Sequence, residues 1–213
     1  QEEEKEQEEE KELEDESNKI KTEVEEALTP EVLNNFDKKR ENAENESHIS
    51  LLIREDNIEE FIKYINLKSI KTTAKLTPSI FETNSFLLQK GSMTSLIDYA
   101  AFFGSINIFL YLLRNEAKLT PDSWLYAVHS NNPEILSYLE DEHNIKDDLT
   151  YINCLKESIK CHHNEMARYF YDNLIYKTQK EDEINELVYS TAFHYCNFSY
   201  FPEDLKKSKN YFI

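Results

Sequence analysis

The chain has 213 residues and a formal net charge of −18, which suits one domain or one domain with a tail. So acidic a chain argues against a nucleic-acid binder, which needs a basic face, and against docking on an anionic membrane. Only two glycines are present, so glycine-rich phosphate loops are excluded and a many-stranded β fold is disfavoured. We therefore expect an all-helical protein.

The N-terminal segment concentrates the charge. Residues 1–28 hold fourteen acidic and four basic residues, which is −10 of the −18. Like charges repel, so residues 1–17 are expected to be disordered or a frayed helix. Apolar residues at helical spacing from Ile20 to Leu28 predict that order begins there. We assign 1–47 to an acidic, partly disordered or helical extension, which serves either as an interaction tail or, the interpretation we favour, as a solvating segment.

One tripeptide predicts helix starts along the chain. Leu-Thr-Pro occurs at 28–30, 76–78 and 119–121, and Leu-Thr recurs at 149–150. Threonine can cap the free amides of a helix, and proline is tolerated at the first helical position because its missing N–H costs nothing there. We therefore expect helices to begin at each of these four sites.

An internal repeat lies between these starts. Residues 99–112 align with 126–139 and with 157–170; a weaker copy covers 190–201 and an earlier one 48–65. Each copy reads as a short helix, a polar turn and a second helix with an apolar stripe. A small residue recurs in the first helix at Ala100, Ala127, Ser158 and Ala192, where it would let neighbouring helices approach closely. Gly104, Asn131 and His162 share the turn column.

Residues 95–105, SLIDYAAFFGS, resemble the ankyrin signature T-P-L-H-x-A-A-x-x-G-H, and the likeness continues through residues 108–117. More closely, the chain is similar to a divergent ankyrin-type domain of unknown function that is abundant in protist proteins and typically precedes ordinary ankyrin repeats. The segments that carry this likeness are 52–56, 78–84, 99–105, 124–127 and 159–164. The resemblance implies an ankyrin-like solenoid of stacked helix-turn-helix repeats over 48–213, behind the acidic helical extension.

The resemblance also implies where a partner would bind. In ankyrin arrays the two residues before each turn face the concave side, and aromatic side chains there are natural anchors. These positions are Phe102, Phe103, His129, Ser130, Lys160, Cys161, His194 and Tyr195. An alternative for the two phenylalanines is burial against the 81–91 insertion.

The residues that could bind a metal ion or act as a nucleophile lie around Cys161. Cys161, His162, His163 and Glu165 cluster, with Cys154 two helical turns before, but no paired spacing typical of zinc occurs. His194 and Cys196 fall one repeat later, about 10 Å away by ordinary helix packing. Adjacent Cys161 and His162 point apart, which makes a poor nucleophile pair. We expect no metal, no cofactor and no catalytic residue.

The predicted function is a protein-protein interaction scaffold that acts inside the cell, in the cytoplasm. The three cysteines have no framework spacing and the longest apolar stretch, 108–113, is too short to cross a membrane. The partner is expected to be a protein, with no nucleic acid and no membrane. The alternative is a structural N-terminal cap of a longer ankyrin array, without a ligand of its own. The opening Gln1 and the apolar end lead us to expect a segment of a longer protein with further repeats after it, and an apolar stripe left open after Phe201 would favour the cap.

Overall fold

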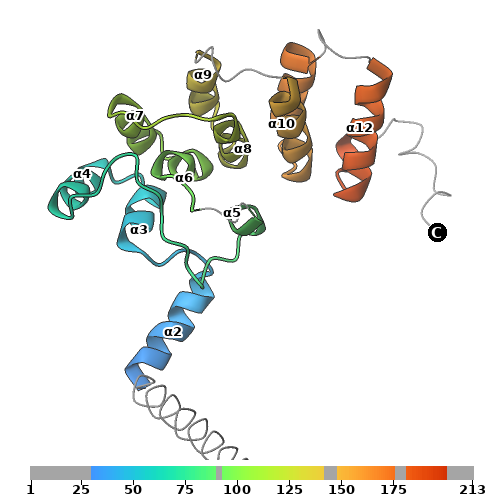
Figure 1. The fold of residues 1–213 in the computed structure, drawn as a ribbon. Helices are drawn as coiled ribbons and strands as arrows, with labels where there is room; N and C mark the ends of the chain where they lie inside the picture. The colour runs from blue at the N-terminus through green and yellow to red at the C-terminus, as the bar shows by residue number, and fades with distance from the viewer. Residues whose placement is uncertain (1–29, 90–92, 142–147, 176–180, 201–213) are drawn as a thin grey trace, which may run out of the picture. The chain divides into compact units, whose positions relative to one another are not determined.

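The computed structural model describes residues 30–89, 93–141, 148–175 and 181–200. Within these ranges the chain forms eleven α-helices and no strand, apart from one isolated bridge between Lys75 and Ser95 (Figure 1). The all-helical expectation is confirmed for this part of the chain. The predictions for residues 1–28, and for a stripe after Phe201, lie outside the described residues.

The chain divides into two compact units, of which the first comprises 1–46 and 79–89. Its described helices are α2 (Pro30–Asn42) and α5 (Ser85–Gln89). Just after α2, the Ala43 carbonyl accepts hydrogen bonds from the Thr83 backbone amide at 3.1 Å and hydroxyl at 2.9 Å. Phe36 meets Phe81 edge to face, with ring centroids 5.1 Å apart. The 79–89 segment is thus held at the end of α2. The predicted division at residues 47 and 48 stays a prediction.

The second unit comprises 47–78 and 90–213 and holds the remaining helices. Helix pairs joined by short turns follow one another along the chain. Their bounds are α3 (His48–Arg54), α4 (Ile58–Leu67), α6 (Leu96–Phe103), α7 (Ile106–Arg114), α8 (Pro121–Ser130), α9 (Pro133–Asp141), α10 (Asp148–Lys160), α11 (Asn164–Tyr169) and α12 (Glu181–His194). A π-helical turn, Phe170–Ile175, continues α11, and a 3-10 turn, Phe198–Tyr200, follows α12.

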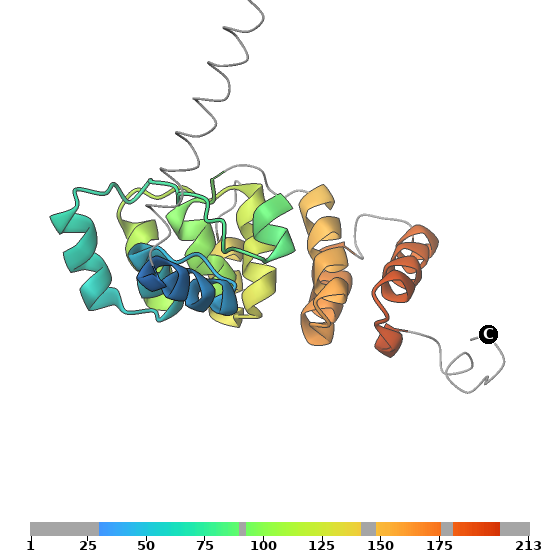
Figure 2. The same cartoon turned by 90° about the horizontal axis from the view of Figure 1, so that it is seen from below.

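The first helices of the pairs form one row. Helix α6 packs between α3 and α8, and α10 packs between α8 and α12. The second helices α4, α7 and α9 also contact one another in that order. Figure 2 shows α10 and α12 standing side by side at the C-terminal end of this unit. This order places the ends of α6, α8, α10 and α12 next to one another.

The predicted helix starts have mixed outcomes. Helix α8 begins at Pro121 as predicted, and the Ser123 hydroxyl accepts the Thr120 amide at 3.0 Å. Pro30 is helical and is the first described residue, so the start predicted at 28–30 lies at the edge of the described range and stays a prediction. The starts predicted at the other two sites are wrong. At 76–79 the chain is not helical, and the Leu76 amide donates to the Thr94 carbonyl at 2.7 Å. Thr150 already lies inside α10, which is helical from Asp148, the first described residue after 141.

The small-residue column lies where the helices meet. Ala100, Ala127, Ser158 and Ala192 are all fully buried, with 0% of their surface exposed. Each lies on the first helix of its pair, within the row of α6, α8, α10 and α12. Because these side chains are small, the helix axes can approach closely there, and a larger side chain would have to displace a neighbouring helix.

The turns after the first helices share a left-handed residue. The φ angles are 73° at Gly104, 51° at Asn131, 60° at His162 and 55° at Cys196. A β-carbon at Gly104 would also lie 3.2 Å from the Ser130 β-carbon, so glycine serves both the backbone conformation and the close approach. The other three residues carry the conformational cost that L-residues pay in this region.

Side chains following the turns tie each pair to the one before it. Each donates to a carbonyl in the last turn of the preceding first helix. The bonds run from the Ser105 hydroxyl to Ile53 at 2.5 Å, from His163 Nδ1 to Val128 at 2.8 Å and from Asn197 Nδ2 to Ile159 at 2.8 Å. Each of these carbonyls also accepts the backbone amide three residues later, so the side chain is its second donor and ties the turn to the neighbouring helix.

Candidate functional site

The eight residues predicted to face a partner lie at the C-terminal ends of four neighbouring helices, or in the turns directly after them. Phe102 is buried, five are half-buried, and two, His194 and Tyr195, are exposed. Seven of them are connected by side-chain contacts, directly or through one further residue. The contacts run from α6 to the turn after α12.

The strip begins with an aromatic cluster on α6. The ring centroids of Phe102 and Phe103 are 5.0 Å apart, and Phe103 also meets Tyr99 at 4.7 Å. The Arg54 guanidinium lies 5.9 Å from the centre of the Phe103 ring and donates to the Tyr99 hydroxyl at 3.0 Å. Such a cation over an aromatic face is attracted by the electron-rich ring. Phe103 is therefore positioned by both α3 and its own helix.

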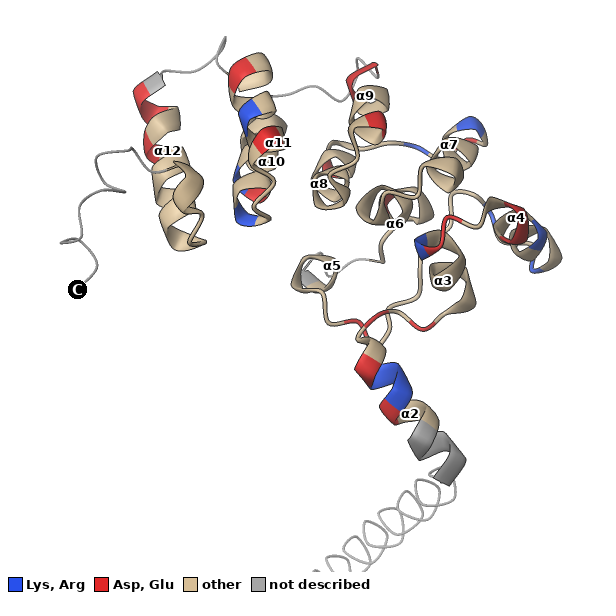
Figure 3. Cartoon of the chain, turned by 180° about the vertical axis from the view of Figure 1, so that it is seen from behind, with Lys and Arg blue, Asp and Glu red and all other residues tan. Residues whose placement is uncertain are grey.

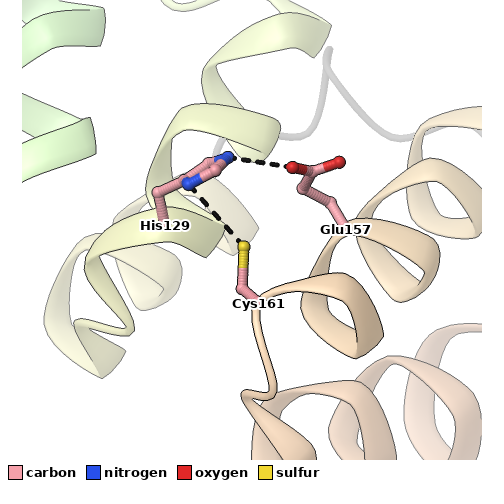
Figure 4. Close-up of side chains that lie close together, drawn as sticks. All are labelled: His129, Glu157 and Cys161. Atoms are coloured by element: carbon pink, nitrogen blue, oxygen red, sulfur yellow. Dashed lines mark hydrogen bonds and ion pairs between the residues drawn. The ribbon is translucent and has the colours of Figure 1, made fainter. Parts of the chain in front are cut away.

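His129 connects α6 to α8 and α10. Its imidazole stacks on Phe102, with centroids 4.7 Å apart and planes 28° from parallel. Its Nε2 lies 3.1 Å from Glu157 Oε1, and its Nδ1 lies 3.7 Å from the Cys161 sulfur. Figure 4 shows the ring between these two side chains of the next helix pair. Both ring nitrogens thus face groups contributed by α10 or the turn that follows it.

The sequence prediction missed Glu157. It occupies the first position of the third repeat copy, where the first two copies have Tyr99 and Tyr126. Its spacing from Cys161 is four residues, one helical turn, which places both side chains on the same side of the end of α10. That spacing was available in the sequence, but nothing in it indicated that His129, 28 positions earlier, would face them.

The charges around Glu157 determine the protonation of the cluster. Burial by itself would raise the pKa of Glu157, but hydrogen bonds from His129 and Lys160 outweigh it and the pKa is lowered. The Lys160 ammonium lies 2.8 Å from Glu157 Oε1, and although burial opposes its charge, this partner raises the pKa of Lys160. Burial, with Glu157 adding to it, raises the pKa of the Cys161 thiol to about 11. At neutral pH the cluster holds an ion pair beside a protonated thiol.

Lys160 connects this cluster to the last helix. Its ammonium lies 5.8 Å from the centre of the Tyr195 ring, and His162 Nε2 donates to the Tyr195 carbonyl at 3.1 Å. Lys160 and Tyr195 also line an open groove of about 600 Å³ between α8, α10 and α12. The groove is lined by Leu125, Asn153, Lys156, Glu157, Lys160, Leu187, Ser190, Thr191, His194 and Tyr195. The acidic residues of α12 lie in the first half of that helix (Figure 3). The second half of α12, which leads to Tyr195, carries no acidic side chain.

We call the connected residues the inner strip: Phe103, Phe102, His129, Glu157, Cys161, Lys160 and Tyr195. Two predicted residues are not included in this strip, Ser130 and His194. The Ser130 hydroxyl donates to the Ala127 carbonyl at 2.9 Å and accepts from the Asn132 amide at 3.3 Å, so it is engaged by its own turn. His194 contacts Tyr195, with centroids 4.7 Å apart, and lines the groove.

The histidines near Cys161 in sequence are engaged elsewhere. His162 bonds the Tyr195 carbonyl and His163 bonds the Val128 carbonyl. The ligand atoms that do converge belong to His129, Glu157 and Cys161, which lie within 4.8 Å of one another. The order Cys, His, Glu also resembles a nucleophile, a base and an orienting carboxylate. However, a thiol with a pKa of about 11 is only a small fraction thiolate at neutral pH.

Replacing Glu157 by Gln should lower the free energy of unfolding at pH 7 by about 1 kcal/mol, because His129 and Lys160 lose a charged acceptor. The lowered pKa means that the stabilisation is present above the ordinary value of 4.5 and is lost as the pH falls through the folded-state pKa. The difference between wild type and Glu157→Gln, measured by urea unfolding, should therefore shrink from pH 7 to below pH 4. A difference that stays constant, or an equal effect of the exposed-site variant Glu186→Gln, would contradict this assignment.

Among the described helices, none is long and apolar enough to cross a membrane. Comparison of the chain with protein-family models, with curated proteins and with solved structures finds no match.

Proposed function

We propose that this protein is an interaction scaffold: a divergent ankyrin-like solenoid over residues 48–213, behind an acidic helical extension, that binds a protein partner and performs no catalysis. The observation that carries the proposal is the inner strip, a run of contacting side chains across α6, α8, α10 and the turn after α12. The row of helix pairs, the buried small residues and the left-handed turns support the solenoid. Action inside the cell, in the cytoplasm, is part of the same proposal.

The character of the strip favours a protein ligand. It combines aromatic side chains at both ends with an imidazole, an ammonium and a carboxylate between them. Interface energy concentrates in aromatic anchors surrounded by weaker polar contacts, and this strip has that composition. The protonated Cys161 thiol supports binding rather than nucleophilic chemistry.

Replacing Phe103 or Tyr195 by Ala should weaken capture of the partner, because each change removes an aromatic anchor at one end of the strip; a loss of about 2 kcal/mol corresponds to roughly 30-fold in affinity. The full chain, immobilised, would be exposed to lysate of its own cell, and the captured proteins compared between variants of equal thermal stability. Tyr138→Ala is the matched control, since Tyr138 on α9 is 37% exposed and Tyr195 is 39% exposed.

Deletion of residues 1–17 completes the test. Charge in that segment should act mainly on the rate of association and fade with salt, so the deletion should change capture little at physiological ionic strength. If the deletion abolishes capture and both aromatic substitutions leave it intact, the partner binds the acidic extension and the proposal fails.

A second candidate function, the N-terminal cap of a longer array, is favoured by the outer face of α12. Tyr189 and Phe193 are 43% and 67% exposed, among the described residues. They align with positions buried on α6, α8 and α10, namely Ile97 and Ala101, Trp124 and Val128, and Leu155 and Ile159. A further helix pair stacked on α12 would cover them. If capping is the whole function, Phe193→Lys should abolish capture and the two strip substitutions should not.

A further inference from the structure

We propose that His129, Glu157 and Cys161 bind one transition-metal ion, with Zn²⁺ as the best match, through one nitrogen, one oxygen and one sulfur. This inference goes beyond the scaffold function and does not rest on it. The three side chains come from α8, α10 and the turn after α10, so the site exists only where these helices pack. The sequence predicted no metal here, because Cys161 was compared with its neighbours along the chain and with His194 and Cys196 one repeat later, but not with His129 one repeat earlier.

The distances suit a small ion. Zinc binds sulfur at about 2.3 Å and nitrogen or oxygen at about 2.0–2.2 Å, so the donor atoms of a tetrahedral site lie roughly 3.3–3.8 Å apart. The Cys161 sulfur and His129 Nδ1 are 3.7 Å apart, and all three donor atoms lie within 4.8 Å of one another (Figure 4). The Glu157 carboxylate lies 3.1 Å from the other ring nitrogen, Nε2, so it would have to turn toward an ion held between the sulfur and Nδ1.

The donors are held in place by neighbours. Stacking on Phe102 orients the His129 ring, and the 2.8 Å contact with Lys160 holds the Glu157 carboxylate. A carboxylate has two oxygens, so one can keep Lys160 while the other reaches the ion. Such outer contacts orient the ligands and strengthen metal sites. Three protein ligands leave the fourth tetrahedral position for water or for a group of a bound partner.

The donor set selects the kind of metal. Sulfur and imidazole favour zinc and its neighbours in the transition series, whereas magnesium and calcium prefer oxygen ligands alone. On binding, the Cys161 S–H bond breaks, its proton passes to solvent and the sulfur forms a bond to the ion. The thiolate and the Glu157 carboxylate then supply two negative charges against the two positive charges of the ion.

The test is titration of the full chain with Co²⁺ and Zn²⁺ at one pH. We expect one Zn²⁺ per chain by calorimetry and, with Co²⁺, a thiolate-to-metal absorption band that Zn²⁺ abolishes. Cys161→Ser should remove the band and weaken Zn²⁺ binding by about 10-fold or more. Cys196→Ser, the matched control at an exposed cysteine, should keep both.

If circular dichroism shows that Cys161→Ser does not fold, the variants Glu157→Gln and His129→Gln test the same site. Each should weaken Zn²⁺ binding by a similar factor, and His129→Gln should shift the Co²⁺ band. Absence of any band with the wild type would overturn the proposal. So would a band lost in Cys196→Ser but kept in Cys161→Ser, or Zn²⁺ affinity unchanged in both Gln variants, because binding would then reside on other residues.

Discussion

Replacing Trp124 by Ala should lower the free energy of unfolding by about 3–5 kcal/mol. Trp124 lies on α8 with 0% of its surface exposed. Its indole meets Tyr151 and Phe170 edge to face, with centroids 5.4 Å and 6.0 Å away. The indole N–H has no hydrogen-bond partner among the described residues. The expected loss of stability therefore comes from lost packing and from the cavity left behind, because no hydrogen bond of the indole is broken.

Urea unfolding followed by far-ultraviolet circular dichroism would measure this loss, since Trp124 is the single tryptophan and its removal eliminates the fluorescence signal. Tyr138→Ala is the control, because that ring is partly exposed on α9. A loss below about 1 kcal/mol for Trp124→Ala, within the range of ordinary surface substitutions, would show that α8 and α10 do not enclose this ring in solution.

Replacing Ala127 by Leu should cost about 1–3 kcal/mol, the usual penalty for inserting methylenes into a packed contact. Ala127 is fully buried on α8, which packs between α6 and α10. Any volume added at this position must therefore separate α8 from its neighbours. Ala100→Leu on α6 should behave alike.

To check this, the thermal midpoint and the free energy of unfolding in urea would be measured for Ala127→Leu and Ala100→Leu and compared with those of Ser137→Leu. Ser137 is exposed on α9, so the same kind of enlargement should leave stability nearly unchanged there. Equal shifts for all three variants would mean that the small-residue column does not lie between packed helices.

Much of the helical architecture follows from local patterns. The alternation of short apolar helices with polar turns predicted the pairs, because a helix must bury one face and a turn needs residues that tolerate a left-handed backbone. Gly104 and Asn131 occupy such turns, and His162, the weakest member of the column, adopts the same conformation. The column of small residues was likewise visible along the chain, and its burial agrees with the expected helix contact.

The same local reasoning failed where a distant segment competes for the backbone. Leu-Thr-Pro begins a helix at Pro121, yet at 76–78 the identical tripeptide begins none. The difference is the Leu76 amide, which donates to the Thr94 carbonyl across 18 positions. Residues 74–76 pair with 94–96, where the Leu96 amide donates to the Ala74 carbonyl, so the backbone before the proline is set by a segment that the tripeptide does not contain.

The candidate site could likewise be predicted only in part from the sequence. The sequence by itself determined an acidic, helical chain and placed Phe102, His129 and Cys161 at equivalent ends of successive helices, because position in a repeat is a local property. Only the tertiary structure decided that His129 lies between Phe102 and Cys161, and that Glu157 joins them. Side-chain convergence depends on how closely α8 and α10 pack and how each is rotated about its axis, and both are set by the whole core rather than by any one segment.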